Sequence, residues 1–211
     1  MKYIKLYESF EDIDIICSKY GIKNYSVNSD GIVDVDGDVY LYNKGLTKLP
    51  LKFGKVSGHF NCRYNNLTTL EGCPQSVGGE FTCGKNTLET LEFCPKSVGG
   101  YFSCANNKLT SLEGCPQSVG SSFHCGENKL KDLYGFPEFF DGDIFYDNNP
   151  VSEILDLFKT NRLGKVIDLL NEYGVIQQDG KLVILDRLEE VFYTLNMEIP
   201  KEINLYNYEV Y

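Results

Sequence analysis

The chain has 211 residues, of which 42% are hydrophobic and 13% aromatic, and its 30 Asp and Glu outnumber its 20 Lys and Arg for a net charge of −10. This length is enough to bury a core without disulfide or metal support, in one large domain or two small ones. The acidity argues against binding to nucleic acid or to a membrane surface, because no basic surplus is present to displace counterions.

The N-terminal segment predicts one helix followed by short strands. Over residues 9–20 apolar positions recur at helical spacing, and Gly21 provides a stop. Alternating apolar residues then predict strands near 25–27, 33–35 and 39–41, joined by SDG and DGD turns. We expect residues 1–38 to form a helix and β-hairpin cap on the first unit of a repeat array.

Asp34, Asp36 and Asp38 are similar to the start of a calcium-binding loop. An EF-hand loop counted from Asp34 requires Gly at its sixth position and Glu at its twelfth, where this chain has Val39 and Gly45. Strand alternation accounts for the same residues, with valines facing the core and aspartates facing solvent. The strand is the favoured interpretation, and calcium binding is left open by the sequence.

Residues 39–155 contain six units of 21 residues, the last one truncated. A fixed period of this length is typical of a solenoid. The period is marked by two columns of cysteines, with Cys62, Cys83, Cys104 and Cys125 in the first and Cys73, Cys94 and Cys115 in the second.

Each unit follows the pattern F-x-C-x-x-N-x-L-x-x-L, which resembles the leucine-rich repeat L-x-L-x-x-N-x-L with Phe and Cys in two leucine positions. Phe60 and Cys62 are two residues apart, so on a strand both face the core. The following asparagine is expected to bond the turn backbone and the neighbouring asparagines. The segment C-P-x-S-V-G-G then returns the chain in an extended conformation. We therefore expect an α/β repeat fold, a leucine-rich-repeat-like solenoid with a parallel β-sheet.

The cysteines are predicted to be structural. The first column begins with Leu41 and ends with Tyr146, so the position accepts hydrophobic residues, and a free cysteine is a small hydrophobe. Parallel strands place same-column Cβ bonds side by side, which does not suit a disulfide. There is no C-x-x-C, and His124 should face away from Cys125. We expect neither a metal site nor a cofactor.

No catalytic residues are predicted. The chain has two histidines 65 residues apart, no phosphate-binding loop and no nucleophile elbow. The recurring V-G-G belongs to the corners of the repeat.

After Pro150 helical spacing replaces the repeat. Helices are predicted over 152–160, 164–173 and near 187–196, with an apolar run at 182–185 and a C-terminal strand in INLYNYEVY. We expect residues 156–211 to form a C-terminal α/β cap. Basic and acidic residues number 4 and 8 over 1–38, 10 and 11 over 39–150, and 6 and 11 over 151–211, so the array itself is nearly neutral.

The lead-in IVDVDGDVYLYNKGLTKLPLKFGKVSG, with units of the form F-x-C-x-x-N-x-L-x-x-L-E-G-C-P-x-S-V-G-G, resembles leucine-rich-repeat-like proteins of unknown function encoded by large tailed bacteriophages. The opening MKYIKLYESF is similar to the starts of many small proteins of such phages. The resemblance covers essentially the whole chain. It implies a viral origin and expression in a bacterial cytoplasm, and it supplies no activity.

The first residues also favour the cytoplasm, since MKYIKLYESF lacks the apolar region and cleavage site of a signal peptide. No stretch approaches the ~18 apolar residues of a membrane helix, so no transmembrane segment is expected. A reducing cytoplasm agrees with free cysteines.

Strand parity predicts a binding surface. With Phe60 and Cys62 inward, Asn61 and Arg63 face outward, and aromatic residues recur at outward positions. Aromatics and arginine are enriched in interface hot spots, although exposed tyrosines on strands also occur for packing reasons. The predicted protein-binding face comprises Tyr40, Tyr42, Asn61, Arg63, Tyr64, Thr82, Tyr101, Ser103, His124 and Phe145.

These features predict a monomeric, non-enzymatic protein-protein interaction module. The expected partner is a host bacterial protein, such as a defence or metabolic component that is inhibited or redirected. The alternative is a structural or packaged component of the virion.

Overall fold

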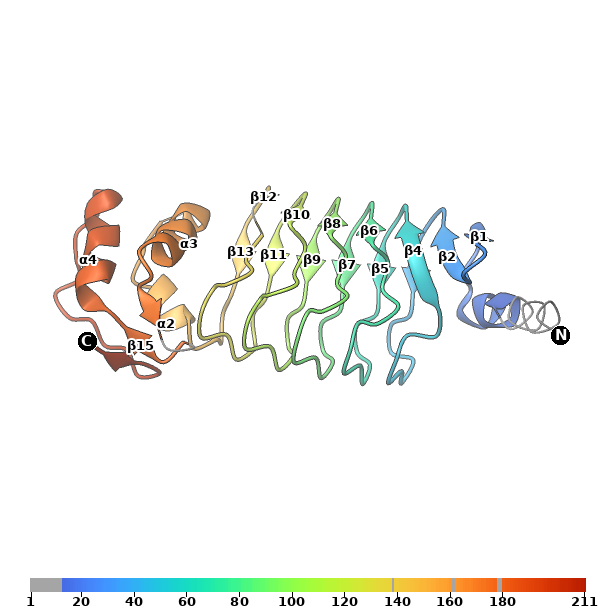
Figure 1. Cartoon of the computed structure of the whole chain (residues 1–211), viewed down its shortest axis with the longest axis horizontal. Coiled ribbons are helices and arrows are strands. Elements are labelled where there is room, and N and C mark those ends of the chain that lie inside the picture. The colour runs from blue at the N-terminus through green and yellow to red at the C-terminus, as the bar shows by residue number, and fades with distance from the viewer. Residues whose placement is uncertain (1–12, 138, 161, 178–179) are drawn as a thin grey trace.

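The computed structural model describes residues 13–137, 139–160, 162–177 and 180–211. Two parallel β-sheets run side by side as a solenoid, with a helix at the N-terminal end and a small helical lobe at the C-terminal end (Figure 1). Strands 21 residues apart are neighbours, so that Phe60 pairs with Phe81 in one sheet and Ser76 with Ser97 in the other. The 21-residue period of the sequence is therefore one turn of the solenoid, as predicted.

The two sheets consist mostly of two-residue strands. Sheet A contains β1 (Tyr25–Val27), β2 (Ile32–Val35), β4 (Lys52–Val56), β6 (Ser76–Val77), β8 (Ser97–Val98), β10 (Ser118–Val119) and β12 (Phe139–Phe140). Sheet B contains β3 (Val39–Tyr40), β5 (Phe60–Asn61), β7 (Phe81–Thr82), β9 (Phe102–Ser103), β11 (Phe123–His124) and β13 (Ile144–Phe145). The sequence predicts one parallel sheet and an extended return, whereas the structure also pairs the S-V segments of the returns, which form sheet A.

The interior is filled by columns of identical side chains. The rings of Phe60, Phe81, Phe102 and Phe123 stack with centroids 5.6, 5.8 and 5.0 Å apart. Beside them the first cysteine column, Cys62 to Cys125, is fully buried. In the second column Cys73 is buried, while Cys94 and Cys115 are half-buried and pack against the core. All eight cysteines are free, and the core-facing placement predicted for both columns is confirmed.

The asparagine column ties consecutive turns together. In Asn86, Nδ2 donates to the carbonyl of Cys83 in its own turn at 2.9 Å and to that of Cys62 in the preceding turn at 3.1 Å. Its Oδ1 accepts from the backbone N–H of Leu67 at 3.0 Å. Asn65, Asn107, Asn128 and Asn149 make corresponding bonds. These bonds run to backbone groups, whereas the sequence also predicts bonds between neighbouring asparagines.

Each turn of sheet B ends in a residue with a left-handed backbone. The residues concerned are Asn43, Tyr64, Lys85, Asn106, Glu127 and Asn148, with φ between +51° and +60°. Asparagine adopts this conformation more readily than most residues, whereas Tyr, Lys and Glu have no intrinsic preference for it. The left-handed turn is therefore imposed by the stacking of the repeats.

The N-terminal part matches its predicted elements where it is described. Residues 13–20 are helical, whereas residues 9–12 of the predicted helix lie outside the described residues. The buried side chain of Cys17 lies on this helix. β1 and β2 form the predicted antiparallel hairpin, with Tyr25 opposite Val35, and β2 joins β4 in parallel.

The C-terminal lobe contains α2 (Ser152–Leu155), α3 (Leu163–Glu172), α4 (Leu185–Thr194) and a third sheet of β14 (Ile176–Gln177), β15 (Leu182–Val183) and β16 (Glu209–Val210). The helix predicted over 152–160 is too long, since α2 ends at Leu155. The chain turns there and Phe158 stacks on Phe192, with centroids 4.4 Å apart. Among the described residues, no helix has both the length and the apolar character required to span a bilayer.

Candidate functional site

The candidate site is the outward side of sheet B, called here the sheet B face. It is formed by the outward side chains of β3, β5, β7, β9, β11 and β13 and by the residues that flank them. Four of the predicted aromatic residues are exposed on it: Tyr40 by 53%, Tyr42 by 46%, Phe145 by 43% and Tyr64 by 38%. The predicted residues thus lie on one surface that spans the length of the solenoid.

A cluster of aromatic and basic side chains lies at one end of this face. The Tyr42 and Tyr64 rings meet edge to face, with centroids 5.1 Å apart. Arg63 and Lys85 both lie over the Tyr64 ring, at 5.4 and 4.8 Å from its centroid, so two cations share one aromatic surface. Lys85 is missing from the predicted set.

Tyr64 and Lys85 reach this surface because of the left-handed turn. Strict strand alternation from Phe60 would point Tyr64 inward, since Phe60 and Cys62 are both buried. The positive φ of +55° breaks the alternation, and the Tyr64 side chain is exposed. The asparagine that recurs two positions before a leucine in successive units was the available signal for a turn at this point.

Thr82 and Ser103 differ from the prediction. Both lie in strands of sheet B at outward positions, yet their residues are only 7% and 4% exposed. The neighbouring residues at the same positions are Asn61 and His124, with larger side chains, and Tyr101 is half-buried beside them. Small side chains between larger neighbours on a sheet are covered, so these two are not free surface residues.

A second cluster lies toward the C-terminal end of the face. The Tyr101 hydroxyl and His124 Nδ1 are hydrogen-bonded at 2.9 Å. His124 also meets Phe145 edge to face at 5.6 Å. Burial raises the pKa of Tyr101 and lowers the pKa of His124, so that both groups favour the neutral form. The pair is a neutral, hydrogen-bonded unit at physiological pH.

Between the two clusters lies a small pocket of about 250 Å³. Two polar atoms of residues that line it, Thr82 Oγ1 and Arg63 Nε, are buried and have no hydrogen-bond partner. Two further lining residues, His59 and Glu80, are absent from the predicted set. The lining residues are Tyr40, His59, Phe60, Asn61, Arg63, Glu80, Thr82 and Tyr101.

The three aspartates of the DVDGD segment accept hydrogen bonds from the next turn of the solenoid. Asp34 Oδ1 accepts from the backbone N–H of Lys55 at 2.6 Å, and Asp38 Oδ1 accepts from that of His59 at 2.7 Å. Asp36 Oδ1 accepts from the Ser57 hydroxyl at 2.8 Å. Val33 and Val35, which alternate with Asp34 and Asp36 along the strand, are buried, as the strand interpretation predicts. Within the described part of the chain no group of three or more His, Cys, Asp or Glu is placed to hold a metal ion.

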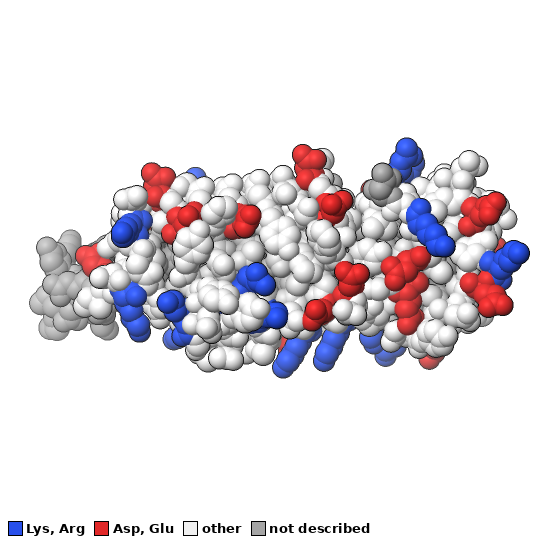
Figure 2. All heavy atoms as spheres, turned by 180° about the vertical axis from the view of Figure 1, so that it is seen from behind, with Lys and Arg blue, Asp and Glu red and all other residues white. Residues whose placement is uncertain are grey.

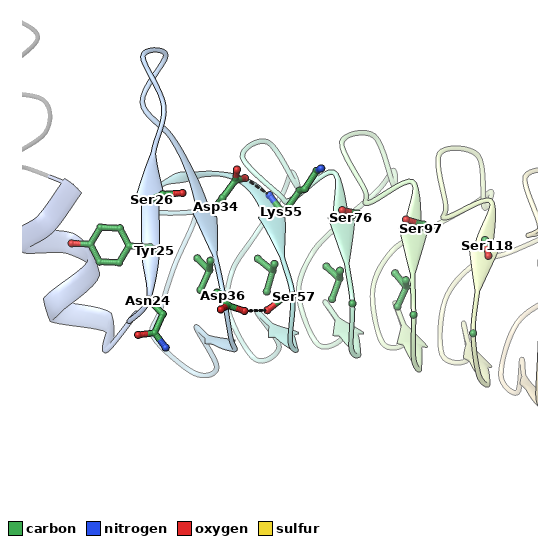
Figure 3. A pocket seen from close by; sticks show the side chains of 17 residues that line it. Asn24, Tyr25, Ser26, Asp34, Asp36, Lys55, Ser57, Ser76, Ser97 and Ser118 are labelled. Carbon is green, nitrogen blue, oxygen red and sulfur yellow. Dashed lines mark hydrogen bonds between the residues drawn. The ribbon is translucent and has the colours of Figure 1, made fainter.

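A larger, open groove of about 810 Å³ lies on the outward side of sheet A (Figure 3). Its floor is made of small residues from successive turns. Ser76, Ser97 and Ser118 point outward along it, and the Asp34–Lys55 and Asp36–Ser57 hydrogen bonds lie at its N-terminal end. The three central turns repeat serine at this position, whereas Lys55 and Phe139 occupy it in the turns on either side.

Charged side chains are sorted over the surface. In the view of Figure 2, most Asp and Glu side chains along the solenoid lie toward the upper edge and most Lys and Arg side chains toward the lower edge. The array is near neutral in sum, and on the face seen in Figure 2 most of its positive and negative charges lie on separate strips.

The buried thiols are poor nucleophiles. Burial raises the pKa of Cys62 and of Cys125 to about 12, and it also raises the pKa of Cys83, Cys94 and Cys104. Because the thiolate is the reactive form, these cysteines are suited to packing.

Comparison with protein-family models, with curated proteins and with solved structures found no significant match.

Proposed function

We propose that this protein is a non-enzymatic binding module and that its ligand is a protein held on the sheet B face. The observation that carries the proposal is the contrast between columns of the repeat. Core positions repeat Phe60, Phe81 and Phe102, and the three central turns of sheet A repeat Ser76, Ser97 and Ser118. No two outward residues in the strands of sheet B are alike: they are Tyr40, Asn61, Thr82, Ser103, His124 and Phe145. A repeat scaffold needs uniform core and corner positions, whereas the variable column is free to match a partner.

The chemistry of this face supports a protein ligand. Exposed tyrosines with a neighbouring arginine supply large, rigid contact area and hydrogen bonds, which interface hot spots require. The cysteines are buried or half-buried, and burial raises the pKa of thiols such as Cys62 and Cys125. His124 is bonded to Tyr101, and burial lowers its pKa, so neither residue type supplies an activated nucleophile.

The partner that we propose is a host bacterial protein, bound by a single copy of this chain in the bacterial cytoplasm. This part rests on the resemblance of the repeat motif to leucine-rich-repeat-like proteins of large tailed bacteriophages. A packaged or structural role in the virion is the second candidate, and it rests on the same resemblance.

Affinity capture from infected host lysate tests the face. Replacing Tyr40, Tyr42 and Phe145 together by alanine is expected to remove the captured protein, because these side chains are exposed and the fold does not depend on them. The matched control replaces three exposed tyrosines elsewhere, Tyr134, Tyr193 and Tyr206, and should leave capture unchanged. Equal capture by both triple variants would refute the assignment of the sheet B face.

Mass spectrometry of purified virions separates the two settings. Stoichiometric copies of the chain in particles would favour the packaged component, and absence from particles would favour action on a host protein.

A further inference from the structure

The pocket in the middle of the sheet B face contains two unsatisfied polar groups. Thr82 is more than nine-tenths buried, and its Oγ1 has no hydrogen-bond partner. The Arg63 Nε atom is also buried and has no hydrogen-bond partner, and Arg63 lines the same pocket. Buried polar atoms in folded proteins are almost always hydrogen-bonded. Two polar groups without hydrogen-bond partners on one small pocket therefore point to a ligand group that forms the missing hydrogen bonds.

These two polar groups define the chemistry of that ligand. Arg63 Nε is a donor only, and Thr82 Oγ1 carries a proton that it can donate. His59 Nδ1 accepts from the backbone N–H of Glu80 at 2.9 Å, which leaves the proton of the neutral ring on Nε2. The pocket thus offers several donors, and their complement is a group with two acceptor oxygens.

Charge favours an anion of low charge. Among the described residues Arg63 forms no ion pair, so no carboxylate of the protein is in direct contact with its guanidinium. Two carboxylates lie nearby. Asp38 is occupied by the backbone N–H of His59 and the hydroxyl of Tyr40, and Glu80 is exposed at the rim. These two negative charges oppose a dianion such as phosphate and leave a single carboxylate as the better match.

The size of the pocket and its surroundings indicate how the carboxylate arrives. A volume of about 250 Å³ is below the ~300–1,000 Å³ usual for small-molecule sites, and it suits one side chain. Tyr40 lines the pocket and Tyr42 does not, and both side chains are exposed and provide contact area for a larger partner. We infer that the pocket receives the carboxylate of an Asp or Glu side chain of the protein partner, a step that rests on the proposed function.

A titration followed by NMR tests the pocket without the partner. The probe is N-acetyl-glutamate α-methylamide, which carries one carboxylate, and the control is its glutamine analogue. We expect the glutamate probe to shift the Arg63 Nε–H and Thr82 amide signals saturably in the millimolar range. Equal shifts with the glutamine analogue, or no shift at Arg63, would overturn the inference. Tighter binding of inorganic phosphate would overturn the carboxylate assignment.

Thr82→Val gives a test that separates a binding role from a structural one. Valine keeps the shape and removes the unpartnered hydroxyl, so the variant should melt at a higher temperature while binding the glutamate probe about tenfold more weakly. Thr87→Val is the matched control, because Thr87 Oγ1 donates to the Leu67 carbonyl at 3.1 Å. It should melt lower and bind the probe normally. A lower melting temperature for Thr82→Val with unchanged binding would refute the inference.

The outcomes distinguish this inference from the proposed function. If a partner captured through Tyr40, Tyr42 and Phe145 binds Thr82→Val and Arg63→Gln as tightly as the unchanged protein, the carboxylate pocket fails and the sheet B face stands. If the probe binds but the aromatic triple variant retains all captured protein, the face proposal fails and the partner is refuted as the source of the carboxylate, while carboxylate binding by the pocket stands.

Discussion

Phe93 occupies the position that Gly72 occupies one turn earlier, and both have a left-handed backbone, with φ of +66° and +91°. Gly114 and Gly135 continue the column with φ of +87° and +82°. Of these four turns only that of Phe93 places a side chain with a Cβ at this corner, and that side chain is 52% exposed. The corner is therefore strained in one turn and relaxed in three.

Replacing Phe93 by glycine should raise the free energy of unfolding by about 1 kcal/mol, because glycine adopts positive φ without the steric cost of a side chain. Urea denaturation measures the change. Phe93→Ala is the control, since it removes the ring but keeps the Cβ, and it should give no comparable gain. A loss of stability in Phe93→Gly would show that the ring makes contacts that outweigh the backbone strain.

Asn86→Ala should lower the free energy of unfolding by about 1–3 kcal/mol, because it leaves the Leu67 N–H without a partner inside the protein. It also removes one of the two amide donors of the Cys62 and Cys83 carbonyls, which keep their bonds to Asn65 and Asn107. The neighbouring Asn66 is exposed, and Asn66→Ala provides the matched control with little expected change. Similar losses for both variants in chemical denaturation would contradict the role assigned to the column.

Alkaline pH should destabilise the protein through its thiols. Burial raises the pKa of Cys62 and Cys125 to about 12 from the ordinary value of 9.0, so their contribution to stability is complete below pH 9.0 and is lost as the pH rises toward about 12. Between these values each thiol lowers the free energy of unfolding by about 1.4 kcal/mol per pH unit.

Denaturation in the presence of a reductant, from about pH 8 to about pH 10.5, measures this slope. Cys62→Ala should be less stable at every pH but should have a shallower slope, by the share of one thiol. An unchanged slope would mean that Cys62 ionises as readily in the folded protein as in the unfolded chain.

The residues just before β16 are hydrogen-bonded to the solenoid at Lys131 and to α2 at Glu153. The Tyr208 hydroxyl donates to the Lys131 carbonyl at 2.8 Å, and the Asn207 backbone N–H donates to Glu153 Oε2 at 3.0 Å. Tyr208→Phe should cost about 1 kcal/mol and speed amide exchange in β16 while leaving the asparagine column protected. Tyr206→Phe, at an exposed neighbouring position, is the control. Uniform acceleration throughout the chain would instead show that the lobe and the solenoid unfold as one unit.

The repeat could be predicted from sequence because each core position recurs at a fixed interval. The spacing of Phe60 and Cys62 predicts a strand with one face toward the core. The same pair of residue types one turn later predicts which residues of neighbouring strands lie opposite each other. Sheet A was predicted only as an extended segment, since strands as short as Ser76–Val77 carry no alternation to recognise. The end of α2 was misplaced because the contact of Phe158 with Phe192 joins positions far apart in the chain.

The site was predictable in outline and not in detail. Strand parity placed Tyr40, Tyr42 and Phe145 correctly on the surface. It could not show that Thr82 is covered, because burial on a sheet depends on which way the longer neighbours lean. Nor could it place Lys85 over Tyr64, since that contact depends on the left-handed backbone at both residues.

The 21-residue register makes the length of this protein adjustable. Phe60 pairs with Phe81 and Phe81 with Phe102, each in the same geometry. Removal of residues 81–101 in frame would bring Phe102 onto Phe60 and Asn107 onto Asn65 with every stacking contact of the core renewed. Duplication of a unit would lengthen both sheets in the same way. Recombination between copies of the repeat within the gene is thus a direct route to binding surfaces of different span, with no new core to be selected.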